Sequence, residues 1–569
     1  MSYLRLAAVA CAVVLCVSLG HPQSIAEPSE VTPEAGSTPS QWAIAYGSGT
    51  LSGVVTPITG GTGYYLYGTR ATMFKGQDTV FAQLDALGRV TWAKEIDWES
   101  MNTDNLNVEP VATGFLVYGN VQTPGNTTQN ELVWAKFGKQ WNRVYAHGFS
   151  GLGTIEGGLF HDTSDGGLLF TGTLIVAAGT KFQCVDTLLF KTDPSGFMSW
   201  KNVLQYGCLD NAGPMLEVSD GYLVAGLIAD PFTKIHGVMV MKHAKTGAGI
   251  LWTNMYSIAN PMVNLDMVGT VGSFKQLSDG NFLVVGLIQE LNPTLGGNRT
   301  YMLKIDPGGG ILWQNSYGST AISMGAQSVI ENTTDKTLLV NGSATNLPSG
   351  NLSIVAFTVN GSSGALIKQK QIGTSLDNNF GAILKSKSGD FYFSGWHSTA
   401  ATDTNLKTIW GKLDPTTLTP TWAKTFSGGN AYGLAIETAT GFFLTGTTTS
   451  YGYNATNRNT FGMILDSTGN YPNCNISPIT LISTEYPNIA STPAGLTLGQ
   501  PEFKSVEVGN VVAVRLPVIN TTIKSLAICP AISSKSEGGS SSEEADPAAD
   551  PNASCAHPEP DAAETIDRD

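Results

Sequence analysis

The chain repeats one pattern of apolar and polar positions eight times. In each repeat, a polar segment is followed by a short, largely apolar run that ends in glycine. The closing glycines are Gly68, Gly119, Gly172, Gly226, Gly286, Gly342, Gly395 and Gly446. Neighbouring members of this series lie 51 to 60 residues apart. A period of this size indicates structural units that stack or close into a ring.

Each repeat predicts four short strands. The polar segment ends in a turn such as Ser278-Asp-Gly280, the glycine-closed strand follows, and an alternating strand of the type at 301–305 comes next. A turn of the form Asp-x-x-Gly, as at Asp306 and Gly309, leads to a last strand that opens with tryptophan. Asp opens such a turn by bonding backbone amides, and glycine takes the positive φ that closes it. Four strands in about 50 residues predict a β-propeller blade.

The tryptophans predict how the ring closes. They stand at Trp92, Trp141, Trp200, Trp252, Trp313 and Trp422, with Ile367 in the corresponding place of the sixth repeat. The eighth repeat has no tryptophan after its turn at Asp466, whereas the N-terminal segment 41–47 matches the missing strand. We therefore expect an all-β, eight-bladed propeller over residues 41–470, closed by the N-terminal strand, with the tryptophans packed between blades.

The segments outside the repeats differ in composition. Residues 1–20 combine Arg5 with the apolar run of a signal peptide, and residues 21–40 form a proline-broken linker. Residues 471–532 contain strand-like runs, which predict either packing against the ring or a small C-terminal β appendage. Residues 533–569 are expected to be a disordered acidic tail. The mature chain should then be monomeric, without a membrane span, and either secreted, at the cell surface or periplasmic.

The charge of the chain gives no sign of a nucleic-acid partner. The net charge is −14, but the last 37 residues alone hold ten acidic residues against two basic ones. Charged residues make up only 13% of the chain, and glycine is abundant at 65 residues. This profile fits short strands joined by tight turns and argues against nucleic-acid binding.

The order of motifs resembles a known family of repeats. An apolar strand, glycine, an alternating strand with Lys-x-Asp, an Asp-x-x-Gly turn, and then Trp and Tyr-Gly are similar to the bacterial secreted β-propeller repeats of the SBBP kind. The resemblance covers about residues 41–470. It implies a propeller fold in an exported protein and no particular activity.

A weaker resemblance is to the quinoprotein dehydrogenases, which are eight-bladed propellers with regularly placed tryptophans. The segment 241–252 keeps Thr246, Gly247 and Trp252 of their docking motif but has His243 where that motif has aspartate. The adjacent cysteine pair of that family is absent from the chain. This resemblance therefore implies the fold alone.

Cysteine usage agrees with export. Cys184 and Cys208 flank a predicted hairpin, so a disulfide between them is plausible in an oxidising compartment. Cys474 and Cys529 could tie the C-terminal segment to the last repeat, which leaves Cys555 unpaired. Neither CxxC nor CxxCH occurs, so the sequence does not support structural zinc or covalent haem.

Charged residues recur a few positions before each glycine-closed strand. They are Glu109, Asp162, Glu217, Lys275, Glu331, Lys385 and Glu437, and His161 precedes Asp162. If these polar segments are innermost, the residues form a ring of mixed charge near one mouth of the channel, where propeller ligands usually bind. Solvated strand ends would carry charge as well, so a purely structural role stays open.

No catalytic motif appears in the chain: HExxH, GxSxG and P-loop patterns are all missing. We predict no catalytic residues, no metal ligands and no cofactor, with calcium as a possibility. The leading hypothesis is an exported, non-enzymatic binding or scaffold module for a protein partner or a surface polysaccharide. One alternative is a periplasmic or extracellular enzyme, either quinone-dependent or carbohydrate-active, with its site at a channel mouth. Another is a structural spacer in a cell-surface assembly.

Overall fold

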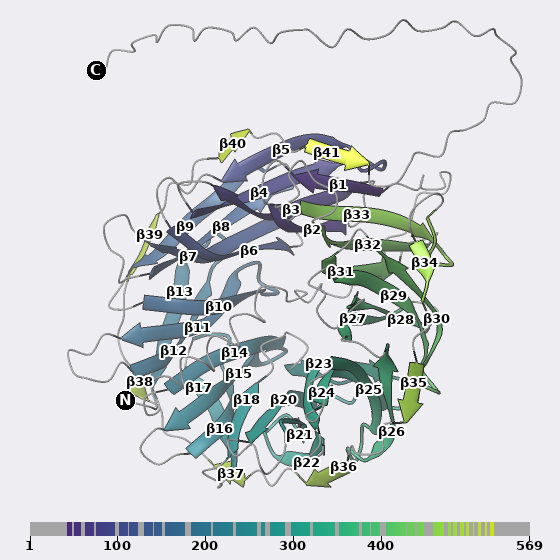
Figure 1. Ribbon diagram of the computed structural model, residues 1–569. Helices are drawn as coiled ribbons and strands as arrows, with labels where there is room; N and C mark the ends of the chain where they lie inside the picture. Colours follow the sequence, from purple (N-terminus) through teal and green to yellow (C-terminus); the bar gives the residue numbers. More distant parts are fainter. Residues whose placement is uncertain are drawn as a thin grey trace, which may run out of the picture. The chain divides into compact units, whose positions relative to one another are not determined.

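The computed structural model describes the repeat region and short stretches of the C-terminal segment. The described residues are 43–47, 51–58, 63–72, 76–96, 102–205, 209–258, 263–398, 406–448, 459–471 and 476–527, apart from shorter stretches inside these ranges. All regular elements in this part of the chain are β-strands, and they form eight blades (Figure 1). The predicted all-β, eight-bladed propeller is confirmed.

Each blade contains four antiparallel strands, taken here from the channel outward. The first strands are β2 (Leu51–Pro57), β6 (Asn102–Val111), β10 (Thr154–Asp162), β14 (Leu209–Val218), β18 (Val263–Met267) with β19 (Phe274–Gln276), β23 (Ile322–Asn332), β27 (Asn378–Lys385) and β31 (Asn430–Glu437). The second strands are β3 (Tyr64–Thr72), β7 (Gly114–Gln122), β11 (Leu168–Val176), β15 (Gly221–Asp230), β20 (Phe282–Glu290), β24 (Thr337–Asn346), β28 (Phe391–His397) and β32 (Gly441–Thr448).

The third and fourth strands complete the blades. The third strands are β4 (Gly76–Leu84), β8 (Asn130–Gly138), β12 (Cys184–Thr192), β16 (Ile235–His243), β21 (Arg299–Ile305), β25 (Leu352–Asn360), β29 (Lys407–Asp414) and β33 (Asn459–Asp466). The fourth strands are β5 (Val90–Ile96), β9 (Arg143–Ser150), β13 (Met198–Gln205), β17 (Ile250–Ile258), β22 (Ile311–Gly318), β26 (Leu366–Gly373), β30 (Thr419–Phe426) and, in blade 8, β1 (Ala43–Gly47). The N-terminal strand β1 pairs with β33, as predicted.

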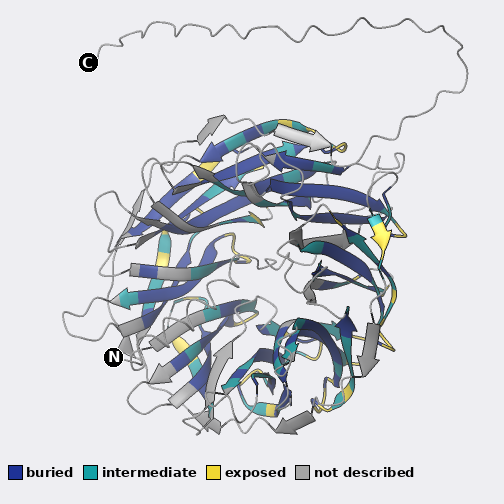
Figure 2. Ribbon diagram, in the orientation of Figure 1, coloured by how far each residue is buried: buried dark blue, intermediate teal, exposed yellow. Residues whose placement is uncertain are grey.

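The hydrophobic core is divided among the contacts between neighbouring blades. The residues whose burial is described form eight buried clusters, one between each pair of neighbouring blades. One of them joins Tyr46 and Phe443 of blade 8 to Val55 and Tyr64 of blade 1 and so closes the ring. The second and third strands are the most buried (Figure 2). Because these strands pack on both sides, they appear in the sequence as continuous apolar runs.

Most of the closing glycines face irregularities in the first strands, whereas the register opposite Gly68 in blade 1 runs without a shift. In blade 6 the register between β23 and β24 shifts between Ala326 and Ser328, opposite Gly342. A Cβ atom on Gly342 would lie 2.1 Å from the Gly325 carbonyl oxygen. Glycine therefore recurs here because a bulged neighbouring strand comes too close for any side chain.

The fourth strands also carry a recurrent bulge, and it corrects two assignments made from the sequence. In blade 6 the strand register skips Ile367, so Lys368, not Ile367, takes the place of tryptophan. In blade 2 that place belongs to Tyr145. Trp141 instead lies in the preceding turn, at a φ of 57°. Spacing alone could not locate the bulge, because one extra residue shifts the alignment without changing the apolar pattern.

Fourth strands also bind the next blade. The Tyr256 hydroxyl donates to the Gly309 carbonyl oxygen of blade 5 at 2.7 Å, and the Tyr317 hydroxyl donates to that of Gly364 in blade 6 at 2.6 Å. Tyr46 of blade 8 repeats the contact with Gly88 of blade 1 at 2.7 Å. These bonds explain the recurrent tyrosine of the fourth strands, and the bond of Tyr46 crosses the ring closure.

The strand order gives the ring two different faces. Turns between first and second strands, and between third and fourth strands, lie on one face, which we call the turn face. Connections between second and third strands and between blades lie on the other face. The third-to-fourth turns are capped as predicted: Asp306 Oδ1 accepts from the amides of Gly308 and Gly310, both at 2.8 Å, and Gly309 has a φ of 84°.

The C-terminal segment does not stand apart from the ring. It supplies a fifth, outermost strand to all eight blades, and we call these eight strands the belt (Figure 1). In chain order they are β34 (Ile476–Pro478), β35 (Ile482–Glu485), β36 (Ala490–Pro493), β37 (Thr497–Gly499), β38 (Lys504–Ser505), β39 (Asn510–Ala513), β40 (Val518–Asn520) and β41 (Lys524–Ala527). They pair with blades 7, 6, 5, 4, 3, 2, 1 and 8 in that order. Of the two expectations for this segment, the strand pairing supports packing against the ring.

Candidate functional site

The charged residues singled out in the sequence sit at the ends of first strands. β6, β10, β14, β19, β23 and β27 all end toward the turn face, and each carries at least one of these residues. The described residues of the predicted ring of mixed charge therefore lie on the turn face. The charged residues of this set make different contacts. Those that bind a neighbouring blade have a structural role, and the contacts of the others are described separately.

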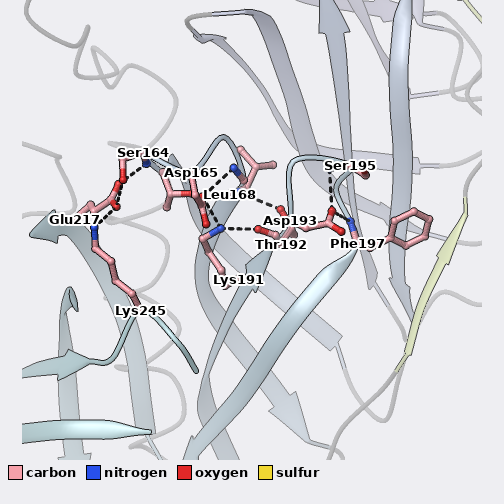
Figure 3. Close-up of polar contacts among 12 residues, drawn as sticks. Ser164, Asp165, Leu168, Lys191, Thr192, Asp193, Ser195, Phe197, Glu217 and Lys245 are labelled. Carbon is pink, nitrogen blue, oxygen red and sulfur yellow. Dashed lines mark hydrogen bonds and ion pairs between the residues drawn. The ribbon is translucent and has the colours of Figure 1, made fainter. Parts of the chain in front are cut away.

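Glu217 joins two blades (Figure 3). Its carboxylate accepts from the backbone amide and the hydroxyl of Ser164 in blade 3, both at 2.6 Å, and forms an ion pair of 2.6 Å with Lys245 of its own blade. Burial alone would raise the pKa of Glu217, but the hydrogen bonds from Lys245 and Ser164 outweigh burial and lower it. Glu217 is therefore an ionised clamp between blades 3 and 4.

Glu331 forms the same clamp two blades farther on. It accepts from the amide of Ser278 at 2.8 Å and from the Ser278 hydroxyl at 2.7 Å. Ser278 lies in the first turn of blade 5, as Ser164 does in blade 3, and Lys336 donates to the Ser278 hydroxyl at 2.7 Å. Both clamps join residues 53 positions apart, which is one repeat.

The two lysines of the ring also reach the preceding or following blade. Lys275 donates to the carbonyl oxygen of Val329 in blade 6 at 3.1 Å. Lys385 lies 3.5 Å from Asn332 Oδ1, also in blade 6, and its ammonium stands 6.0 Å from the centre of the Phe391 ring. These contacts place both lysines in the same structural role as the clamps.

A second set of ion pairs was not predicted from the sequence. Within a blade, a lysine of the third strand bonds the aspartate of the first turn. The pairs are Lys191–Asp165 at 2.9 Å, Lys242–Asp220 at 2.7 Å, Lys304–Asp279 at 2.5 Å and Lys412–Asp390 at 2.8 Å. In three of the four pairs the lysine belongs to a Lys-x-Asp pattern that follows the turn aspartate by about 25 residues, but only the register of the blade shows that the two residues meet.

Glu109 behaves differently from the clamps. Among the described residues, no hydrogen bond or ion pair involves its carboxyl group, although the side chain is partly buried. Burial raises the pKa of Glu109 to about 8, and the charge of Asp162 in the next blade adds to the rise. The carboxyl group is thus held largely protonated near neutral pH.

The surroundings of Glu109 combine donors and acceptors. Burial raises the pKa of Tyr67 in blade 1 and of Tyr118 in blade 2, and the charge of Glu109 adds to both shifts. Asp162 is exposed. Burial lowers the pKa of His161, although the charges of Glu217 and Asp162 oppose that shift. The charge of Asp162 acts on both Glu109 and His161, and we call these three residues of blades 2 and 3 the mouth site.

Several predicted residues cannot be placed in this site. The side chain of Glu437 and the side chains of Cys184, Cys208, Cys474 and Cys529 lie outside the described residues. In the described part of the chain, no three His, Cys, Asp or Glu side chains are grouped so that they could hold a metal ion, so the possible calcium has no candidate site there. The search for a helix able to span a membrane, made over the same residues, found none.

Comparisons with known proteins add little to the geometry. No family model matches the chain, and no curated protein matches it. Three solved structures share 10% identity with it. A protein of unknown function from Dyadobacter fermentans aligns with a TM-score of 0.30, covering 55% of this chain and 94% of its own.

The second structure is a neuraminidase-like protein of A/little yellow-shouldered bat/Guatemala, with a TM-score of 0.27 over 55% of this chain and 98% of its own. The third is an ACO/RPE65 chimera, with a TM-score of 0.29 over 67% and 92%. Similarity this low carries no argument, so the resemblance to SBBP repeats rests on the residues alone.

Proposed function

We propose that the protein is an exported binding module that takes a surface polysaccharide at the turn-face mouth, with the mouth site as its contact. The propeller fold is compatible with a binding or scaffold role, and the N-terminal segment has the features of an export signal. The observation that carries the proposal is Glu109, whose carboxyl group has no partner among the described residues and whose pKa burial and the charge of Asp162 raise to about 8.

The chemistry of this pair suits hydroxyl groups. A protonated carboxyl group donates one hydrogen bond, and an ionised carboxylate only accepts. Glu109 and Asp162 together therefore offer a donor and acceptors side by side, as a sugar diol requires. The clamps at Glu217 and Glu331 already use their acceptor capacity within the ring, so we do not assign them to the ligand.

The experiment measures thermal unfolding of the mature chain with a panel of polysaccharides and oligosaccharides. A ligand at a hundred times its dissociation constant adds about 2.7 kcal/mol of stability, which shifts the midpoint. We expect the shift in the wild type and in the control E331Q, and its loss in E109L, whose side chain has neither a donor nor an acceptor. An equal shift in E109L would remove the mouth site from the proposal. No shift with any glycan would overturn the polysaccharide ligand and leave a protein partner.

A carbohydrate-active enzyme is the second candidate, and the same pair favours it. Glycoside hydrolysis uses two carboxyl groups, one of which is a general acid with a raised pKa, and Glu109 has such a raised pKa. Release of reducing ends from a glycan that shifts the midpoint would support this candidate, and E109Q should abolish that release. A quinone-dependent dehydrogenase is not proposed, because no observation in the described part of the chain favours it.

A further inference from the structure

The belt passes from blade to blade in uniform steps. The linkers between successive belt strands are 479–481, 486–489, 494–496, 500–503, 506–509, 514–517 and 521–523. Each contains three or four residues, so three or four residues suffice to cross from one blade to its neighbour at the outer rim. Seven linkers join eight strands, and one step around the ring is left without a linker.

The open step lies between the two ends of the belt. β41 pairs with β1 in blade 8, and β34 pairs with β30 in blade 7. Blades 7 and 8 are neighbours that share a buried cluster. Every belt strand runs antiparallel to the fourth strand it covers. A connection from Ala527 to Ile476 would therefore run in the same direction as the seven linkers.

In the sequence, two cysteines flank the strands that border this open step. Cys529 is the second residue after β41, and Cys474 is the second residue before β34. A disulfide between them would place Ile528, Cys529, Cys474 and Asn475 across the step. The Cα atoms of a disulfide lie about 4.4–6.8 Å apart, against about 3.8 Å across a peptide bond. This path has nearly the length of a four-residue linker, which the belt uses four times.

We propose that Cys474 and Cys529 form a disulfide that closes the belt into a covalent hoop around the propeller. The two thiols lose two protons and two electrons, and the acceptor is a thiol–disulfide oxidoreductase of the oxidising compartment that an exported chain enters. The hoop would keep β1 between β33 and β41, so that neither the N-terminal strand nor the end of the belt could detach from blade 8. The proposal rests on export and is independent of the mouth site.

The test is peptide mapping of the full mature chain, exported into an oxidising compartment and alkylated before denaturation. We expect one cross-linked peptide that contains Cys474 and Cys529 and disappears on reduction. Alkylated Cys474 or Cys529, or a bond from either to another cysteine, would overturn the proposal. Mapping uses the native chain, so it does not depend on a variant that folds.

Cysteine variants supply a second readout. C474S, C529S and the double variant should lower the unfolding midpoint by the same amount, because all three remove one bond. Reduction of the C184S/C208S variant, which lacks the other candidate pair, should lower its midpoint by that same amount. Additive losses in the two single variants would contradict the hoop.

Discussion

At the scale of single residues, glycine and aromatic side chains meet across each blade boundary. Gly364, in the last turn of blade 6, has a φ of 69°. A Cβ atom there would lie 2.5 Å from the Trp313 ring and 2.5 Å from the Asn315 side chain of blade 5. Gly196 and Gly247 face Tyr145 and Trp200 in the same manner. The repeated turn glycine of one blade therefore packs against the aromatic residue at the tryptophan position of the preceding blade.

This contact predicts unequal costs for two glycine substitutions. G280A should cost about 1 kcal/mol for left-handed backbone strain, because Gly280 has a φ of 82° and nothing within 4 Å of its built Cβ atom. G364A should cost that amount plus about 1–3 kcal/mol of overpacking against Trp313. Thermal unfolding midpoints measure the difference. Equal losses would show that the ring of Trp313 does not depend on the glycine.

At the scale of the elements, the first strands hold the blades together at the turn face. The clamps at Glu217 and Glu331 bond the first turn of the preceding blade at the same offset of one repeat. A carboxylate that accepts an amide and a hydroxyl at once makes strong, charge-assisted bonds. These clamps add a polar contact to each apolar cluster between the blades concerned.

Loss of one clamp should destabilise the protein measurably. S278A removes the hydroxyl that donates to Glu331 and accepts from Lys336, and we expect a loss of about 1 kcal/mol because the site is partly exposed. S195A is the matched control, since Ser195 is an exposed turn residue that forms hydrogen bonds through its backbone amide and carbonyl oxygen, not through its hydroxyl. Its expected effect is under about 0.5 kcal/mol. A neutral S278A would argue against a stabilising clamp.

The strands and turns could be predicted from the sequence, but the contacts between blades could not. The polar segments, the glycine-closed strands and the Asp-x-x-Gly turns were all predicted, because each has its own local signal. The bond from Ser278 to Glu331 was not, because it depends on the register between two blades. Trp141 and Ile367 were misassigned for a related reason, since a bulge moves the alignment by one residue.

At the scale of the whole molecule, the ring closes in three ways. β1 completes blade 8, a buried cluster joins blade 8 to blade 1, and the belt crosses all eight blades. The first was predicted from the displaced Trp-Tyr-Gly segment. The belt was not, because its strands are only two to four residues long and carry no period that sequence analysis can detect.

Glu109 of the mouth site should make the free energy of unfolding of the chain depend on pH. A carboxyl group whose pKa is raised by folding costs stability as the pH rises, because the unfolded chain releases the proton more readily. For Glu109 the window runs from about 4.5 to about 8. Glu217, whose pKa is lowered, acts in the opposite sense: its stabilisation is present above about 4.5 and is lost as the pH falls through its folded value.

The most direct test is the unfolding midpoint of the wild type, E109Q and E217Q from pH 4 to pH 9. We predict that E109Q gains stability over the wild type as the pH rises from about 4.5 to about 8, since the amide cannot ionise. E217Q should fall below the wild type at neutral pH and converge with it in acid. If the E109Q and wild-type curves run parallel, Glu109 is an ordinary carboxylate. The mouth site, and the function built on it, would then be contradicted.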